Sequence, residues 1–225
     1  MNILLEVGAA SSYPRAMDQV DALETGWRGS REGWLEAGYQ ALIDGGIDAV
    51  KIQPLAKRLN LSRTSFYWFF DDRDALLAAL IEGWEGRTTR PLVDSAMRYA
   101  ESRSEAMLNV LACFLSGAFD ARLEFAVRSW ALQDERVAAR VRAADEARLS
   151  GLSEMLSRWG CDASEADIRA RTVYLVQIGY ISMQAEEDIE TRLKRIPMYV
   201  TIYAGREPEP REIARFNAGI RRQAG

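Results

Sequence analysis

Histidine is absent from this chain of 225 residues, and its absence excludes several kinds of enzyme. It removes the commonest general base, the commonest metal ligand and every Ser-His-Asp arrangement. The Glu-x-x-His pairs of di-iron bundles are excluded for the same reason. A phosphate-binding glycine loop is also lacking, because Gly45-Gly46 leads only into the turn before the next helix. We therefore expect no catalysis, no cofactor and no metal, and we expect Glu186-Glu187-Asp188 to form a solvated helix boundary.

Cysteine and long apolar runs are scarce as well. The two cysteines, Cys113 and Cys161, are isolated in the sequence, and we expect both to be reduced. Residues 1–20 start with a short apolar stretch but have no basic region before it, which is not typical of an export signal. No later stretch is long enough to span a bilayer. These features predict a cytoplasmic protein with no membrane partner.

The alternation of apolar and polar residues that is typical of β-strands is rare in this sequence. Its length leaves room for one small and one larger helical domain. The most informative segment is Leu55–Phe70, LAKRLNLSRTSFYWFF, which predicts two short helices joined by a sharp turn. Asn60 tolerates the left-handed backbone that such a turn uses, and Ser62 is a good N-cap for the second helix. Phe66, with Phe69 or Phe70, is expected to anchor that helix inward.

The outer face of the second helix is small, polar and basic, which suits insertion into the major groove of DNA. Arg63 can pair with guanine or hold a phosphate, while Thr64 and Ser65 are short enough to allow close approach. Tyr67 offers a hydroxyl to a phosphate. For Trp68 two interpretations stay open, contact with DNA or cover for a small core. The net charge of −4 does not oppose DNA binding, because only the contacting face must be positive.

Flanking segments complete a four-helix module. Residues 30–44 predict an amphipathic first helix that ends at Gly45-Gly46, and Asp72 is expected to cap a fourth helix. Residues 31–81 resemble the DNA-binding domain of the TetR family of bacterial transcriptional regulators. The resemblance is carried by Gly46-Ile47-Asp48-Ala49, Leu55-Ala56, Leu61-Ser62, Phe66-Tyr67-Trp68-Phe69 and Ala75-Leu76-Leu77. It implies that Thr64, Ser65, Tyr67 and Trp68 face DNA, and that Arg73 stands where the family usually has a phosphate-binding lysine. Lys51 departs from the Thr or Ser that the family often has before the second helix; it cannot cap that helix, but its charge can reach a phosphate.

The rest of the chain predicts a bundle of longer helices. We expect them near residues 104–119, 121–133, 165–187 and 189–204, with Ser164 as a cap. A further long, charged helix is expected to run through Val141 and to end near Trp159-Gly160. Pro197 is expected to kink the helix near 189–204 or to end it early. The predicted organisation is an arm (1–27), a helix-turn-helix domain (28–88, motif 51–70), a ligand-binding and dimerisation domain (89–205) and a tail without an assigned role (206–225). The fold class is all-α, with a three-helix DNA-binding domain joined by a linking helix to the larger helical domain.

The resemblance also implies a homodimer, in which the last two long helices pair with their copies across a two-fold axis. Two recognition helices would then read a two-fold operator with half-sites about 34 Å apart. The residues expected at this interface are Val176, Gly179, Tyr180, Met183, Leu193, Ile196 and Tyr199. A small-molecule pocket is implied in the larger domain, with walls drawn from Met107, Phe114, Phe119, Phe125, Trp130, Tyr174 and Met183. At any single position, ordinary core is the alternative interpretation.

The sequence thus predicts a DNA-binding regulator, a repressor that binds its operator as a homodimer and is released by a small-molecule effector. Wall composition alone suggests an apolar or aromatic effector. The alternative is a helical module that binds small molecules or proteins and no longer reads specific DNA.

Overall fold

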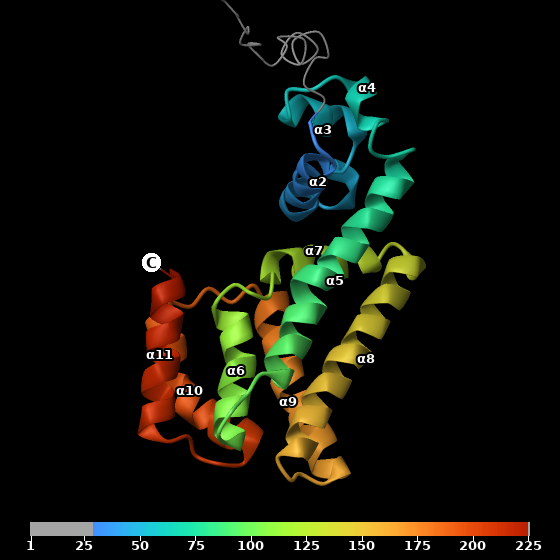
Figure 1. Ribbon diagram of the computed structural model, residues 1–225. Helices are drawn as coiled ribbons and strands as arrows, with labels where there is room; N and C mark the ends of the chain where they lie inside the picture. Colours follow the sequence, from blue (N-terminus) through green and yellow to red (C-terminus); the bar gives the residue numbers. More distant parts are fainter. Residues whose placement is uncertain (1–28, 225) are drawn as a thin grey trace, which may run out of the picture.

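The computed structural model describes residues 29–224, and this part of the chain is helical throughout (Figure 1). It contains ten α-helices and one short 3-10 helix, and no strand occurs among the described residues. The predicted all-α class is therefore confirmed. The predicted arm, residues 1–27, lies outside the described residues.

The N-terminal module contains α2 (Arg31–Gly45), η1 (Ile47–Ala49), α3 (Ile52–Arg58) and α4 (Arg63–Phe66). The first helix begins where Ser30 accepts a hydrogen bond from the Gly33 amide, at 3.0 Å. It ends at Gly46, which has a φ of 70°, a backbone conformation that glycine adopts with little strain. The predicted first helix and its glycine ending are confirmed.

The turn between α3 and α4 has the predicted chemistry. Asn60 adopts a φ of 54°, the left-handed conformation that its short polar side chain tolerates. Ser62 then caps α4 by accepting a hydrogen bond from the Ser65 amide, at 3.3 Å. The angle between the two helices therefore depends on one residue with positive φ and one hydroxyl cap.

The helix α5 (Arg73–Met97) starts at the predicted cap, since Asp72 accepts from the Ala75 amide at 2.8 Å. It continues out of the N-terminal module and runs into the larger bundle, beside α8 (Figure 1). Pro91 lies inside it without ending it. One uninterrupted helix thus connects the N-terminal module with the bundle.

The larger bundle contains α6 (Arg103–Leu115), α7 (Ala121–Ala131), α8 (Glu135–Arg158), α9 (Ala163–Ser182), α10 (Ile189–Ala204) and α11 (Pro210–Ala224). Asp162, not Ser164, caps α9, and the helix ends at Ser182, earlier than expected. Pro197 lies within α10 and does not end it.

The chain after Gly205 is more ordered than a tail without a role. Residues 210–224 form α11, which packs against α6 (Figure 1). Its apolar side buries Phe216 and Ile220, while Glu212 accepts a hydrogen bond from the Ser102 hydroxyl at 2.5 Å. The last helix is thus a structural part of the bundle.

Two hydrophobic clusters divide the molecule, and their division differs from the predicted boundary at residue 88. One cluster joins the N-terminal module to the first half of α5, to α7 and to the start of α8. The other joins the second half of α5 with α6, α9, α10, α11 and the end of α8. By packing, α7 therefore belongs with the N-terminal module, because its buried residues share a core with that module.

Substitutions of Asn60 test whether the stability of the protein depends on the positive φ at this position. Asn60→Val should lower the free energy of unfolding by about 1–2 kcal/mol, because a β-branched residue is strained at positive φ. Asn60→Gly should leave it within about 0.5 kcal/mol. Urea unfolding followed by circular dichroism measures both, and equal stability of the two variants would contradict the role given to this turn.

Candidate nucleic-acid interface and ligand cavity

The helix α4 and the two residues that follow it present a polar and aromatic outer surface. Arg63, Thr64, Tyr67 and Trp68 are all exposed there, and Lys51 is exposed just before α3. Arg63 donates a hydrogen bond to the Tyr67 hydroxyl at 3.3 Å, so these two side chains lie together one turn apart. Trp68 is 62 % exposed, which rules out the interpretation that it covers the small core.

A buried aromatic cluster holds this surface in place. The Phe66 ring is fully buried, edge-on to Trp34 at 5.3 Å between ring centroids and stacked on Phe70 at 5.4 Å. Phe66 and Phe70 are therefore the inward anchors, while Phe69 is only half-buried. Because α4 is a single turn, its position depends on this packing more than on its own hydrogen bonds.

Two predicted DNA contacts have hydrogen-bond partners within the chain. Ser65 is buried, and its hydroxyl donates to the Ser62 carbonyl at 2.8 Å, so it supports the turn instead of facing DNA. Arg73 is half-buried and donates to the carbonyls of Val50 and Ile47, at 2.6 and 2.9 Å. It fastens the start of α5 to the segment before α3, and its contact with a phosphate stays a prediction.

A cavity of about 410 Å³ opens between the two parts of the molecule. Phe114 and Phe125, both predicted as pocket walls, line it together with Ile43 of α2 and Ile181 of α9. Arg122, Gln177, Tyr180 and Arg192 supply polar groups. The wall is thus more polar than expected, and it includes a residue of the DNA-binding module.

The other predicted wall residues lie elsewhere. Met107 and Phe119 are buried in the hydrophobic core, so the core interpretation holds for them. Trp130 is buried beside a smaller groove lined also by α5 and α8. Met183 is 80 % exposed just after α9, and Tyr174 belongs to a buried polar network.

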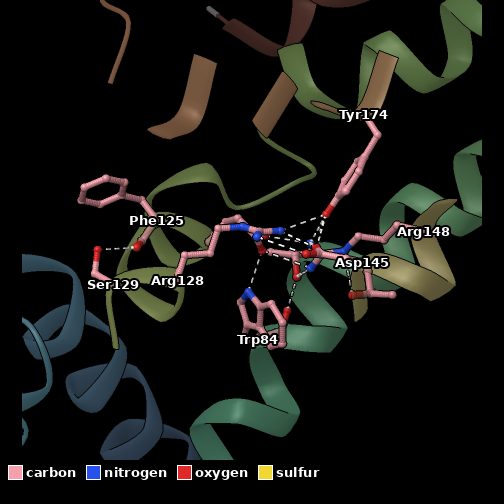
Figure 2. A network of polar contacts seen from close by, with 10 residues as sticks. Trp84, Phe125, Arg128, Ser129, Asp145, Arg148 and Tyr174 are labelled. Atoms are coloured by element: carbon pink, nitrogen blue, oxygen red, sulfur yellow. Dashed lines mark hydrogen bonds and ion pairs between the residues drawn. The ribbon is translucent and has the colours of Figure 1, made fainter. Parts of the chain in front are cut away.

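That network centres on the ion pair between Arg148 and Glu124 (Figure 2), which the sequence did not indicate. Both side chains are fully buried, and the Arg148 Nη1 lies 2.8 Å from the Glu124 Oε1. Glu124 also accepts from the Trp84 indole at 2.7 Å and from the Arg128 Nε at 2.8 Å. Arg148 donates further to Thr88, at 2.8 Å. Helices α5, α7 and α8 meet at this pair.

A second acid and a tyrosine complete the network. Asp145 pairs with Arg128 and accepts from the Tyr174 hydroxyl of α9, at 2.5 Å. Burial raises the pKa of Tyr174, so its hydroxyl stays protonated and can donate. Burial lowers the pKa of Arg148, but the charge of Glu124 and the hydrogen bonds to Glu124 and Tyr174 together outweigh burial and hold that pKa above its ordinary value. The two positive charges of Arg128 and Arg148 are therefore neutralised by the two negative charges of Glu124 and Asp145.

The residues expected at a dimer interface are not all on the surface. Leu193 and Ile196 are buried in the core of their own chain, so their assignment to an interface is wrong. Tyr180 and Tyr199 are half-buried and share a hydrogen bond of 3.1 Å within the chain. Val176 and Gly179 are half-buried, and Gly179 faces open space.

The strongly exposed apolar residues of α9 and α10 are different ones. Ile168 and Leu175 lie seven residues apart on α9, while Met198 and Ile202 lie four apart on α10, so each pair shares one helix face. All four are more than half exposed. These two helices contact each other, and the exposed residues extend over both.

Two further expectations can be compared with residues 29–224. Within this range no group of three or more acidic or cysteine side chains is placed to hold a metal ion. No helix in the same range combines the length and apolar character needed to cross a bilayer.

Cys113 and Cys161 are both free and buried, and burial raises the pKa of each thiol.

Comparison with known proteins places this geometry in a family. Residues 35–80 match the family model described as bacterial regulatory proteins, tetR family. A search of curated proteins gave no match. The helix-turn-helix lies within the matched residues, so this module is similar to the corresponding part of that family.

Solved structures show the same fold over most of the chain. A TetR-family regulator from Mesorhizobium loti superposes with a TM-score of 0.58 at 11 % identity, covering 84 % of this chain and 95 % of its own. GusR from Salmonella enterica gives 0.57 at 15 % identity, with 78 % and 95 % covered. A regulator from Aquifex aeolicus gives 0.53 at 18 % identity, with 86 % and 98 % covered. Over the part that is covered, this chain therefore shares its fold with these solved regulators.

Removing one charge from the buried network should destabilise the protein strongly. We expect Glu124→Gln to lower the free energy of unfolding by about 3–5 kcal/mol, because it leaves Arg148 and Arg128 buried without their shared carboxylate. Glu135→Gln is the matched control. Its side chain is 82 % exposed and paired with Arg142, so the loss should stay below about 1 kcal/mol. Similar effects of both substitutions in urea unfolding would contradict the importance of the network.

Proposed function

We propose that the protein is a transcriptional repressor that binds a two-fold DNA operator as a homodimer. The proposal rests on four exposed residues on α4 and directly after it, within the segment that matches the tetR family model. They are Arg63, Thr64, Tyr67 and Trp68. The aromatic cluster beneath them holds the helix rigidly enough to enter a major groove. Lys51, Lys57 and Arg58 are exposed around it and provide positive charge for phosphates. Such a function places the protein with the DNA in the cytoplasm.

The dimer is proposed to form through the exposed apolar faces of α9 and α10. Contiguous apolar surface on a protein commonly marks an interface, because burying it is favourable. The open space at Gly179 allows a second helix to approach closely. A dimer doubles the number of base contacts, so it supplies affinity that one short recognition helix lacks.

The cavity is proposed to receive a small-molecule effector that releases the operator. It is lined by α6, α7, α9, the segment before α10 and α10 itself, and by Ile43 of the DNA-binding module. An occupant of this space would therefore touch both parts of the protein. Repression follows if the empty protein is the form that fits the operator.

Substitutions on the recognition helix should weaken binding to DNA from upstream of the protein's own gene. We expect Thr64→Ala and Tyr67→Phe each to lower affinity about tenfold in gel-shift titrations, because each removes a hydroxyl contact from both half-sites. Tyr99→Phe is the matched control, since Tyr99 is 82 % exposed outside the motif. Binding by the unaltered protein should also weaken steeply with salt, as phosphate contacts release counterions. Salt-insensitive binding, or normal binding by both variants, would contradict the proposal.

Charges placed on the exposed apolar faces should separate the subunits. We expect Leu175→Glu and Met198→Glu to convert the dimer to monomers in sedimentation velocity at micromolar concentration, because each buries an unpaired carboxylate at the interface. Leu132→Glu is the control, since Leu132 is 88 % exposed away from both helices. A dimer that survives both substitutions, or dissociates equally with Leu132→Glu, would place the interface elsewhere.

A further inference from the structure

The cavity between the two parts of the molecule contains an amide that has no partner. Gln177 is 95 % buried on α9 and lines the cavity, yet its side chain makes no hydrogen bond to any residue in the range 29–224. A buried polar group is ordinarily satisfied, and leaving it unpaired is unfavourable. Its accessible polar atoms therefore mark a position where a polar ligand group would be stabilised.

A guanidinium lies in the same region. Arg192 of α10 lines the cavity and is half-buried, with its guanidinium carbon 4.8 Å from the centroid of the Tyr180 ring. Within the described part of the chain, this guanidinium has no carboxylate within ion-pair distance. A small adjoining cavity is bordered by the same three side chains, so Gln177, Tyr180 and Arg192 are neighbours. This cation–π contact helps to position the guanidinium, whose planar shape suits bidentate binding of a carboxylate.

The charges around the cavity favour an anion over a cation. Arg122 and Arg192 line it, against one carboxylate, that of Glu186. Glu186 is exposed in the segment between α9 and α10, where water satisfies it. Ile43, Phe114 and Phe125 supply apolar wall, and Gln184 adds a second uncharged amide. A volume of about 410 Å³ lies within the range of small-molecule sites, roughly 300–1,000 Å³.

We infer that this cavity binds an organic carboxylate with an apolar, aromatic-sized body, whose charged end is held by Arg192 and Gln177. The apolar body then lies against the two phenylalanines and reaches Ile43 of α2. This assignment names the chemical class of the effector, and its regulatory part rests on the proposed repressor function.

The same cavity adjoins a chain of ion pairs that leads to the helix-turn-helix. The Arg122 Nη2 lies 3.5 Å from one oxygen of Asp44, at the end of α2, and the Arg58 Nη1 of α3 lies 3.5 Å from the other. These exposed pairs are individually weak, so they can be rearranged readily. A ligand carboxylate in the cavity attracts Arg122 away from Asp44 and loosens the contact of α7 with α2 and α3.

The ligand class is tested with matched probes on the full-length protein. In isothermal titration calorimetry, 1-naphthylacetate should bind at least tenfold more tightly than the isosteric 1-naphthylacetamide and than 1-naphthylethylamine. Arg192→Gln should abolish the preference for the acid, whereas Lys194→Gln, which removes an exposed charge from the same helix, should keep it. Equal binding of acid and amide, a preference for the amine, or an acid preference that survives Arg192→Gln would each overturn the assignment.

The regulatory part is tested separately on DNA. In gel-shift titrations, 1-naphthylacetate should lower operator affinity about fivefold or more, and Arg122→Gln should reduce that effect to about twofold or less. An undiminished effect in Arg122→Gln would overturn the role of the Arg122–Asp44–Arg58 chain. If the protein binds no operator at all, the proposed function fails, while the calorimetric comparison still decides the ligand class.

Discussion

The buried ion pair between Arg148 and Glu124 constrains the arrangement of the whole molecule. A guanidinium with no exposed surface is unfavourable by several kcal/mol unless its charge and its hydrogen bonds are satisfied. Here the partners come from α5, α7 and α9, so those helices must keep their register relative to α8 for the pair to be tolerated. Apolar packing alone would accept small slips between helices, whereas this network does not.

The position of the network matters as much as its chemistry. It lies where the two hydrophobic clusters meet, with Trp84 of the DNA-binding side donating to Glu124. Tyr174 is one turn from the cavity residue Gln177 on α9, and Arg128 is one turn from the cavity residue Phe125 on α7 (Figure 2). The wall of the cavity and the junction of the two parts are therefore built on the same helices. A hydrogen-bonded network rearranges between discrete states and does not deform gradually, which suits a switch.

Local signals made the helix-turn-helix predictable from the sequence. The positive φ of Asn60, the cap at Ser62 and the anchor at Phe66 each follow from residue type and spacing, and all are present. The intrachain hydrogen bonds of Ser65 and Arg73 do not follow from residue type, because they depend on how the turn and α5 close on the preceding segment. The buried role of Glu124 could not be predicted for a similar reason. The sequence does place Glu124 within an apolar stretch, LEFAV, which indicates that its side chain is buried. Its partner Arg148, however, is 24 residues away on another helix, so the sequence does not show that the two residues pair.

The helices α9 and α10 show why periodicity could not identify an interface. Each carries apolar residues on two faces, so a stripe at helical spacing is compatible with either the core or the surface. Packing decides between them: Leu193 and Ile196 are enclosed by the chain's own core, which leaves Leu175 and Met198 outside. A single exposed apolar side chain is unremarkable, but here two helices that contact each other each expose a pair of apolar residues on one face. The same reasoning separates the cavity walls, because Phe114 and Phe125 face space while Met107 and Phe119, equally apolar, face neighbouring side chains. Burial in the folded chain, and not residue type, therefore determines which apolar positions are left for a second subunit or a ligand.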